Sequence, residues 1–303
     1  MYIKNLFKEN NLVFSFEIFP PKSTSPIEVV YKTLEELKDL NPDFISVTYG
    51  AGGSISENRT GHIANVIKNN YGIEPMAHLT SIGSKREDIE EILMDLKIKG
   101  VKNILALRGD IPKQGIKLGD YNYASDLITH IRKFGDFDIS AACYPEGHHK
   151  GESLEENLIY LKEKVNAGAE HLVSQLFFNN NYFYNFLDKA RSKGIDVPVE
   201  AGIMPVVNKK QIERIVSLCG ATFPEKFMKI VNRYEHDKIA LRDAGIAYAV
   251  EQIVDLISTG VEGIHLYTMN NSYIARKISE SIQSIIKSVN NKKVIYGEEK
   301  WKK

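Results

Sequence analysis

Short apolar runs typical of buried strands alternate with segments of helical periodicity along nearly the whole chain of 303 residues. Helical patterns lie between the strand-like runs, for instance at 29–40, 85–99, 154–166 and 182–193, and each is followed by a glycine or Asn-Pro turn signal. Eight such alternations predict an α/β protein, a (β/α)8 TIM barrel in a single domain. The strand-like runs are residues 13–19, 44–49, 75–80, 103–107, 138–144, 171–178, 198–204 and 263–269.

The predicted barrel occupies residues 1–290 and is followed by a polar C-terminal tail at 291–303, which we expect to fray. The gap before the last strand is longer and contains extra helical stretches at 224–233 and 237–258, so we expect an insertion there. A doubly wound open sheet is the alternative fold. It is disfavoured because the segment GAGGSI at 50–55 lacks the last glycine of a GxGxxG fingerprint.

Charge and composition narrow the classes of partner. The 39 basic and 39 acidic residues cancel, and no basic stripe is present, which argues against a nucleic-acid or acidic-membrane partner. The N-terminal segment MYIKNLFKENN lacks the apolar core of a signal peptide. Only Cys143 and Cys219 occur, without a CxxC motif, so neither a disulfide framework nor a cysteine zinc site is indicated. We expect a cytoplasmic protein.

The segment ALRGDIP at 106–112 marks the end of the fourth apolar run. Opposite charges around a glycine are costly to bury, and Arg108 and Asp110, two residues apart, would share one face of a strand. This pattern indicates the wall of a site, with a surface turn as the alternative. Five other strands carry polar residues toward their C-terminal ends on the parity that we assign to the barrel interior: Glu17, Thr48, His78, Tyr144 and Gln175.

Nine segments together give the chain a resemblance to a known family. They are FSFEIFPPK (14–22), SVTYGAGG (46–53), AHLT (77–80), ALRGD (106–110), YASDL (123–127), DISAACYPEGH (138–148), KVNAGAEHLVSQLFF (164–178), GIMPV (202–206) and HLYTMN (265–270). In this order they resemble the 5,10-methylenetetrahydrofolate reductases. The length is similar to that of the family's bacterial catalytic barrel, without the regulatory domain of the eukaryotic enzymes.

The resemblance implies a flavin bound non-covalently at the C-terminal mouth of the barrel, FAD in preference to FMN. A reductant such as NAD(P)H gives hydride to the flavin and leaves, and the folate then receives that hydride on its one-carbon unit. Glu17 matches the general acid of the family, and a desolvated carboxyl can remain protonated near neutral pH. Asp110 matches an acid beside the flavin and the pterin, and Gln175 matches an amide that contacts the folate.

The flavin-binding positions of the family also have counterparts in this chain. Arg108 and Lys164 supply positive charge suited to a cofactor phosphate or to the flavin ring. The matched positions are Thr48, Tyr49, Ala51, His78, Arg108, Gly109, Asp110, Ala124, Tyr144, His148 and Lys164.

Four positions depart from the family pattern. Lys209 replaces an aromatic residue that stacks on the reductant and on the folate, and Asn157 and Tyr160 replace an Asp and an Asn that contact the cofactor. Asn271 replaces an arginine after the last strand. Some family members receive electrons from a partner subunit, which would fit Lys209. We therefore expect a homo- or hetero-oligomer.

Two alternative functions remain beside the reductase, and a metal site is a third, disfavoured interpretation. One is a folate-binding methyl-transfer subunit without flavin chemistry, and another is a flavin barrel of the proline dehydrogenase kind. A metal site built from His148, His149, Cys143 and Glu146 is disfavoured, because adjacent histidines point apart and no i, i+4 spacing is present. We expect no metal.

Overall fold

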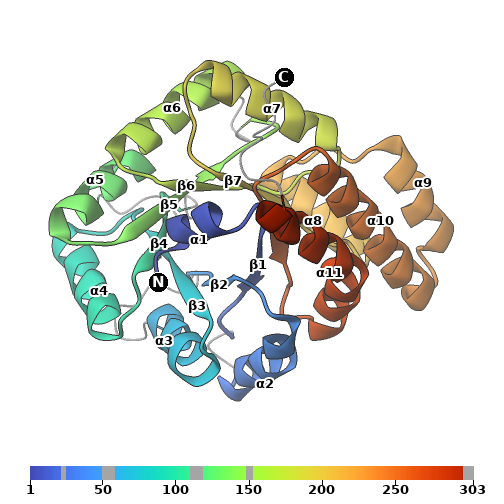
Figure 1. Cartoon of the computed structure of the whole chain (residues 1–303), viewed down its shortest axis with the longest axis horizontal. Helices are drawn as coiled ribbons and strands as arrows, with labels where there is room; N and C mark the ends of the chain where they lie inside the picture. Colours follow the sequence, from blue (N-terminus) through green and yellow to red (C-terminus); the bar gives the residue numbers. More distant parts are fainter. Residues whose placement is uncertain (22–24, 50–58, 110–118, 148–152, 296–303) are drawn as a thin grey trace.

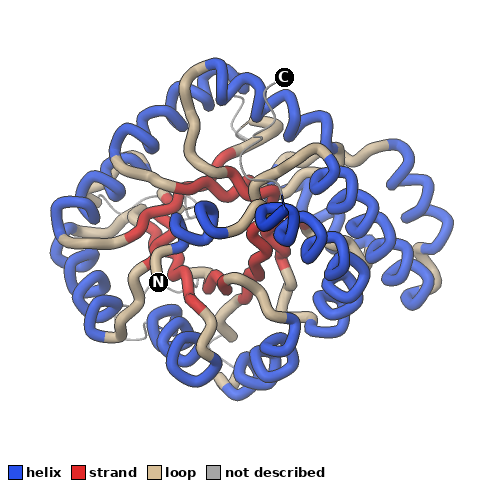
Figure 2. Tube along the Cα trace, in the orientation of Figure 1, coloured by secondary structure: helices blue, strands red, loops and turns tan. Residues whose placement is uncertain are grey.

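The strands close into a parallel barrel in which each strand pairs with its neighbours in the chain and β8 pairs with β1. The structure is a computed structural model that describes residues 1–21, 25–49, 59–109, 119–147 and 153–295. The strands form an inner ring and the helices an outer ring (Figure 2). This arrangement is the predicted (β/α)8 TIM barrel.

The elements follow the predicted alternation (Figure 1). The strands are β1 Val13–Ile18, β2 Phe44–Val47, β3 Glu74–Thr80, β4 Asn103–Leu107, β5 Asp138–Cys143, β6 His171–Ser174, β7 Val199–Ile203 and β8 Gly263–Tyr267. The helices are α1 Ile3–Glu9, α2 Glu28–Leu37, α3 Arg59–Tyr71, α4 Arg86–Ile98, α5 Ala124–Phe134, α6 Leu154–Ala167, α7 Asn180–Ser192, α8 Lys209–Cys219, α9 Glu225–Tyr234, α10 Lys238–Ser258 and α11 Ser272–Ile295.

Helix α1 lies across one end of the barrel (Figure 1). Its residues Ile3 and Leu6 are buried in a cluster with barrel-interior residues such as Phe44 and Met76. Asn103 at the start of β4 accepts the backbone N–H of Ile3 at 3.0 Å. Because α1 covers the N-terminal ends of the strands, the open mouth is at their C-terminal ends. The sequence analysis did not predict this helix.

The strand register decides which side chains face the interior. Leu105 of β4 pairs with His78 of β3 and with Ser140 of β5, and it packs in the interior cluster. Ala106 packs instead in the large core between strands and helices. The predicted interior parity is therefore wrong by one residue at Ala106, while Arg108 lies beyond β4 and Asp110 lies outside the described residues. The prediction assumed that the strand continues past Leu107, where it ends.

The expected insertion before β8 is confirmed, with α9 and α10 close to the predicted bounds. These helices and α8 cover a separate apolar cluster that includes Phe178, Phe227 and Val231. Gly245 of α10 allows close packing, since a Cβ there would lie 1.9 Å from the carbonyl oxygen of Val206. The last helix, α11, extends to Ile295, so the predicted boundary at residue 290 falls inside a helix.

Candidate active site

A cavity of about 1030 Å³ opens at the C-terminal ends of the strands. Among the described residues, it is lined by all of the predicted site positions: Glu17, Thr48, Tyr49, His78, Arg108, Gly109, Ala124, Tyr144, Lys164 and Gln175. Ala51, Asp110 and His148 lie outside the described residues. The structure thus brings the described part of the predicted site into one place.

Glu17 lies at the end of β1 and is buried. Its Oε2 is 3.5 Å from Nε2 of His78 on β3 and 3.6 Å from Nε2 of His265 on β8. Burial lowers the pKa of His78 to about 4, an effect that the Glu17 charge only partly opposes. His78 is therefore a neutral imidazole at physiological pH. A buried carboxyl flanked by two imidazoles has the components for proton transfer.

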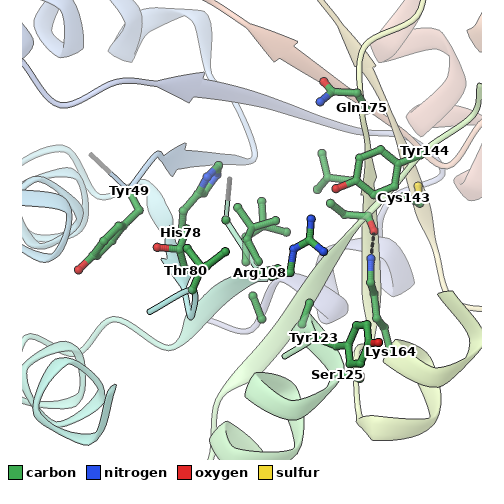
Figure 3. A pocket seen from close by; sticks show the side chains of 18 of the residues that line it. Tyr49, His78, Thr80, Arg108, Tyr123, Ser125, Cys143, Tyr144, Lys164 and Gln175 are labelled. Atoms are coloured by element: carbon green, nitrogen blue, oxygen red, sulfur yellow. Dashed lines mark hydrogen bonds between the residues drawn. The ribbon is translucent and has the colours of Figure 1, made fainter. Parts of the chain in front are cut away.

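Arg108 reaches the cavity because the chain turns directly after β4. The backbone N–H of Ile82 donates to the carbonyl of Arg108 at 2.8 Å, which fixes the start of the turn. Gly109 follows with φ of +90°, and a Cβ there would lie 2.9 Å from Cγ2 of Ile82. Glycine meets both constraints. Figure 3 shows the Arg108 side chain between His78 and Tyr144.

Lys164 contacts the end of β5, in the part of the cavity wall that carries Ala142 and Tyr144. Its Nζ donates to the carbonyl of Ala142 at 2.9 Å and lies 5.5 Å from the centre of the Tyr144 ring (Figure 3). The N-terminus of α5 also borders the cavity through Tyr123 and Ala124. Since a helix N-terminus favours anions, this side of the cavity suits a phosphate.

The ends of β6 and β8 complete the wall. The Gln175 N–H donates to the Cys143 carbonyl at 2.7 Å, and its side-chain Oε1 accepts the N–H of Leu176 at 2.9 Å. The Tyr267 hydroxyl donates to the carbonyl of Ser174 at 2.7 Å. Burial raises the pKa of Tyr267 well above its usual value, so this phenol stays neutral.

Three buried polar residues of this region had no role in the sequence analysis: Tyr267, His265 and Glu200. Tyr267 and His265 lie in the segment HLYTMN, and Glu200 lies on β7. The signal that could have found them is parity, because Glu200 and Gly202 pair with Gly263 and His265 and so share the interior face.

Neither a reactive thiol at Cys143 nor a metal site is indicated among the described residues. Burial raises the pKa of the Cys143 thiol to about 12, so this thiol is neither a nucleophile nor a ready metal ligand. Within residues 1–21, 25–49, 59–109, 119–147 and 153–295, no three His, Cys, Asp or Glu side chains cluster in a way that could hold a metal ion. In the same residues, no helix has the length and apolar character needed to span a membrane.

Comparison with known proteins decides the family. The sequence profile described as "Methylenetetrahydrofolate reductase" matches residues 2–283. The chain belongs to the methylenetetrahydrofolate reductase family. The 5,10-methylenetetrahydrofolate reductase of Pectobacterium carotovorum subsp. carotovorum is 35% identical over 268 residues, which are 88% of this chain and 89% of that protein. The corresponding protein of Escherichia coli K12 is 34% identical, over 88% of this chain and 90% of its own length.

A plant relative and a solved structure extend the comparison. Methylenetetrahydrofolate reductase (NADH) 1 of Arabidopsis thaliana is 35% identical over 88% of this chain, which matches 48% of that longer protein. A structure from Clostridium thermocellum, described as an uncharacterized protein that binds two copies of 5-methyl-5,6,7,8-tetrahydrofolic acid, has a TM-score of 0.62 at 14% identity. It covers 95% of this chain and 100% of its own, and at this identity it supports the fold alone.

The departures from the family pattern have different places in the structure. Asn157 and Tyr160 of α6 line the cavity, where the Tyr160 ring stacks on that of Tyr123 with centres 6.2 Å apart. Lys209, at the first position of α8, forms an ion pair with Glu235 and is not among the described residues that line the cavity. The departure at Lys209 therefore changes a position outside the cavity wall.

Proposed function

We propose that this chain reduces 5,10-methylenetetrahydrofolate to 5-methyltetrahydrofolate with a bound flavin as hydride carrier. The observation that carries the proposal is the position of Glu17. It is a buried carboxyl at the cavity floor, on the interior face of β1 and flanked by the imidazoles of His78 and His265. The family membership supplies the substrate class, and the site supplies the acid that the reaction needs.

Glu17 would act on the folate. The five-membered ring of methylenetetrahydrofolate opens when N10 is protonated, which leaves an electrophilic iminium at N5 that can accept hydride. Glu17 would supply that proton from the wall of the cavity. Proton donation of this kind contributes roughly 10²–10⁴-fold to a rate.

The cavity residues fit a flavin. The His78 Nε2 atom is buried and makes no hydrogen bond within the described ranges, so it can meet a heteroatom of a ligand. Arg108 supplies a fixed positive charge, and the N-terminus of α5 suits a cofactor phosphate. The flavin, when bound, accepts hydride from a reductant and delivers it to the folate. Lys164 holds the end of β5, and with it Tyr144, against the cofactor side of the cavity.

The folate would contact Gln175 and Asp110. Because the Oε1 of Gln175 already accepts the Leu176 N–H, its NH2 group is the part that can donate to a pterin. Asp110 keeps the role implied by the family, that of an acid beside both flavin and pterin. We propose FAD as the cofactor and NAD(P)H or a partner subunit as the electron source.

The proposal is tested by separating the two half-reactions. The purified protein should carry a flavin, and Arg108→Ala should lose most of its flavin absorption. Glu17→Gln keeps the shape of the side chain, so flavin binding and flavin reduction should stay near the wild-type level. Reoxidation by methylenetetrahydrofolate, followed in a stopped-flow spectrophotometer, should slow by roughly 10²–10⁴-fold.

Each alternative has a distinct result. Protein that is colourless and cannot be reconstituted with FAD or FMN would support the non-redox folate-binding barrel. Reduction of the flavin by proline, without turnover of the folate, would support the proline dehydrogenase kind. An unimpaired folate half-reaction in Glu17→Gln would remove the assigned acid.

A further inference from the structure

The end of β1, where Glu17 stands, is held on one side by the turn that follows β8. The backbone register between β8 and β1 ends at the pair of Tyr267 and Glu17. On the other side, the register between β1 and β2 extends to Ile18. Beyond Tyr267, two side chains of the turn, those of Thr268 and Asn270, continue the connection to β1.

The carboxamide of Asn270 contacts the backbone of Phe19 at two points. Its Oδ1 accepts the Phe19 N–H at 2.8 Å, and its Nδ2 donates to the Phe19 carbonyl at 2.8 Å. In a sheet, a neighbouring strand supplies such an acceptor and such a donor to one residue. The Asn270 side chain therefore replaces the backbone of a longer β8 at the position of Phe19.

The backbone of β1 cannot continue this pairing, because the two residues after Phe19 are Pro20 and Pro21, which have no N–H. The Thr268 hydroxyl donates to the Glu17 carbonyl at 2.7 Å and accepts the N–H of Asn270 at 3.2 Å. The ends of an element open most easily. The contacts of the turn close the end of β1 on which Glu17 stands.

The turn has a costly backbone conformation. Met269 and Asn270 are consecutive residues with φ of +52° and +54°. Asparagine adopts this left-handed region more readily than most residues, whereas a methionine there is uncommon. Strained backbone of this kind persists where the surrounding structure enforces it, and it gathers at functional sites. The contact that this turn makes is the pairing of Asn270 with Phe19.

The Glu17 carboxyl depends on the backbone that carries it. Its Oε2 lies 3.5 Å from Nε2 of His78 and 3.6 Å from Nε2 of His265. Both distances are longer than those of normal hydrogen bonds, so these imidazoles surround the carboxyl without fixing it. A shift at the end of β1 would move Glu17 relative to a ligand in the cavity that it lines.

We propose that Asn270 is a positioning residue for Glu17: the left-handed turn after β8 places its carboxamide on Phe19 and so fixes the end of β1 from which Glu17 reaches the cavity. The proposal rests on the proposed function, since it needs Glu17 to donate a proton to the folate. Asn270 is not among the described residues that line the cavity, so its effect passes through the backbone of β1.

The test uses Asn270→Gly in the flavin-loaded enzyme, with the flavin reduced by dithionite before mixing. Glycine adopts a positive φ without strain, so the variant removes both hydrogen bonds to Phe19 while the turn can keep its conformation. The limiting rate of flavin reoxidation at saturating methylenetetrahydrofolate should fall by roughly 10–10²-fold, because a misplacement of about 1 Å can cost about 10²-fold. Flavin content and the folate concentration that gives half of the limiting rate should change little.

Asn41→Gly is the matched control. Asn41 also has a positive φ, of +50°, but it lies before β2, at the end of the barrel away from the cavity. Its replacement should leave the folate half-reaction unchanged. Asn270→Asp keeps an acceptor for the Phe19 N–H and loses the donor, so it should slow the reaction less than Asn270→Gly. It is the second variant to use if the glycine variant does not fold.

A double-mutant cycle separates positioning from a general loss of structure. In a Glu17→Gln background, Asn270→Gly should slow the folate half-reaction no further, because the group through which Asn270 acts has already been changed. Two results would overturn the proposal: an undiminished limiting rate in Asn270→Gly, or the same further slowing in Glu17→Gln as in the wild type. Failure of the proposed function looks different, because Glu17→Gln alone would then leave the folate half-reaction unimpaired.

Discussion

Asp43 carries a pH dependence of stability that can be worked out from the structure. It lies just before β2, where its Oδ2 accepts the Phe14 N–H at 2.7 Å and its Oδ1 accepts from Asn10 at 3.5 Å. Desolvation raises the pKa of this carboxyl from 3.8 to about 6, with a smaller contribution from the negative charge of Glu200, and the Phe14 N–H opposes the shift. Because the folded state binds the proton more tightly than the unfolded state, the stability contributed by Asp43 is present below pH 3.8 and is lost as the pH rises through about 6.

The size of the effect follows from the shift. About two pKa units at roughly 1.36 kcal/mol each would give about 3 kcal/mol for a fully buried group. Asp43 is partly exposed, so we expect about 2 kcal/mol over the whole window and about 1 kcal/mol of it between pH 5 and 7.5. Asp43→Asn has no such titration, so its stability relative to the wild type should increase by that amount over this range.

The assay is urea unfolding of both proteins at pH 5, 6, 7 and 7.5, followed by circular dichroism. Groups that titrate in both proteins cancel in the difference between them. Asp126→Asn serves as a comparison on the exposed N-terminal turn of α5, where the carboxylate accepts the N–H groups of Asn122 and Tyr123. Parallel stability curves for Asp43→Asn and the wild type would refute the reasoning, as would a difference that shrinks as the pH rises.

Two further predictions concern the redox site. If Asp110 has the place beside the flavin that the family pattern implies, Asp110→Asn removes a negative charge there, so the flavin potential should rise and folate affinity should fall, measured by equilibrium redox titration and by binding of 5-methyltetrahydrofolate. An unchanged potential with unchanged affinity would make Asp110 a turn residue. In the family pattern an aromatic residue that stacks on the reductant stands where this chain has Lys209, which pairs with Glu235 outside the described cavity lining. Such a stacking contact is worth roughly 0.5–1.5 kcal/mol, so the isolated chain should oxidise NADH poorly, and Lys209→Phe should recover up to about tenfold if the reductant extends to α8. Rapid reduction of the wild type by NADH at low micromolar concentration would contradict this.

The repeating pattern made the fold predictable because each strand and helix carries its own local signal. The range 103–107 coincides with β4, and the helices predicted at 224–233 and 237–258 are α9 and α10. Helix α1 was missed because it is short and its Tyr2 N-cap position has no side-chain hydrogen bond. Such a helix gains most of its stability from the interior cluster that it covers, which is tertiary information.

The site residues could be predicted where a charged side chain stands out within one sequence segment. They could not be predicted where their position depends on how two distant strands pair. Glu17 and Arg108 stand out in the sequence because charges at strand ends are unusual. The predicted interior parity was wrong at Ala106 of β4, whereas Arg108, which follows the end of that strand, lines the cavity as expected. The contact of His265 with Glu17 joins residues from opposite ends of the chain, and only the pairing of β8 with β1 brings them together.

The buried polar layer in the barrel interior, formed by Ser15, Ser140, His171, Glu200 and His265, is unusual because the interior layers of TIM barrels are mostly filled by branched aliphatic residues. Burying polar side chains such as His171 and Glu200, whose Nε2 and Oε2 atoms lie 3.0 Å apart, costs desolvation, and apolar residues of the same volume often serve stability as well or better. Apolar side chains would be enough to fill the interior of the barrel. Hydroxyl and imidazole groups on neighbouring strands are therefore not explained by packing alone. The layer instead reaches Glu17, the carboxyl to which the proposed function assigns proton donation. The barrel interior therefore has two levels, a lower level of fully buried polar side chains and an upper level whose side chains line the cavity.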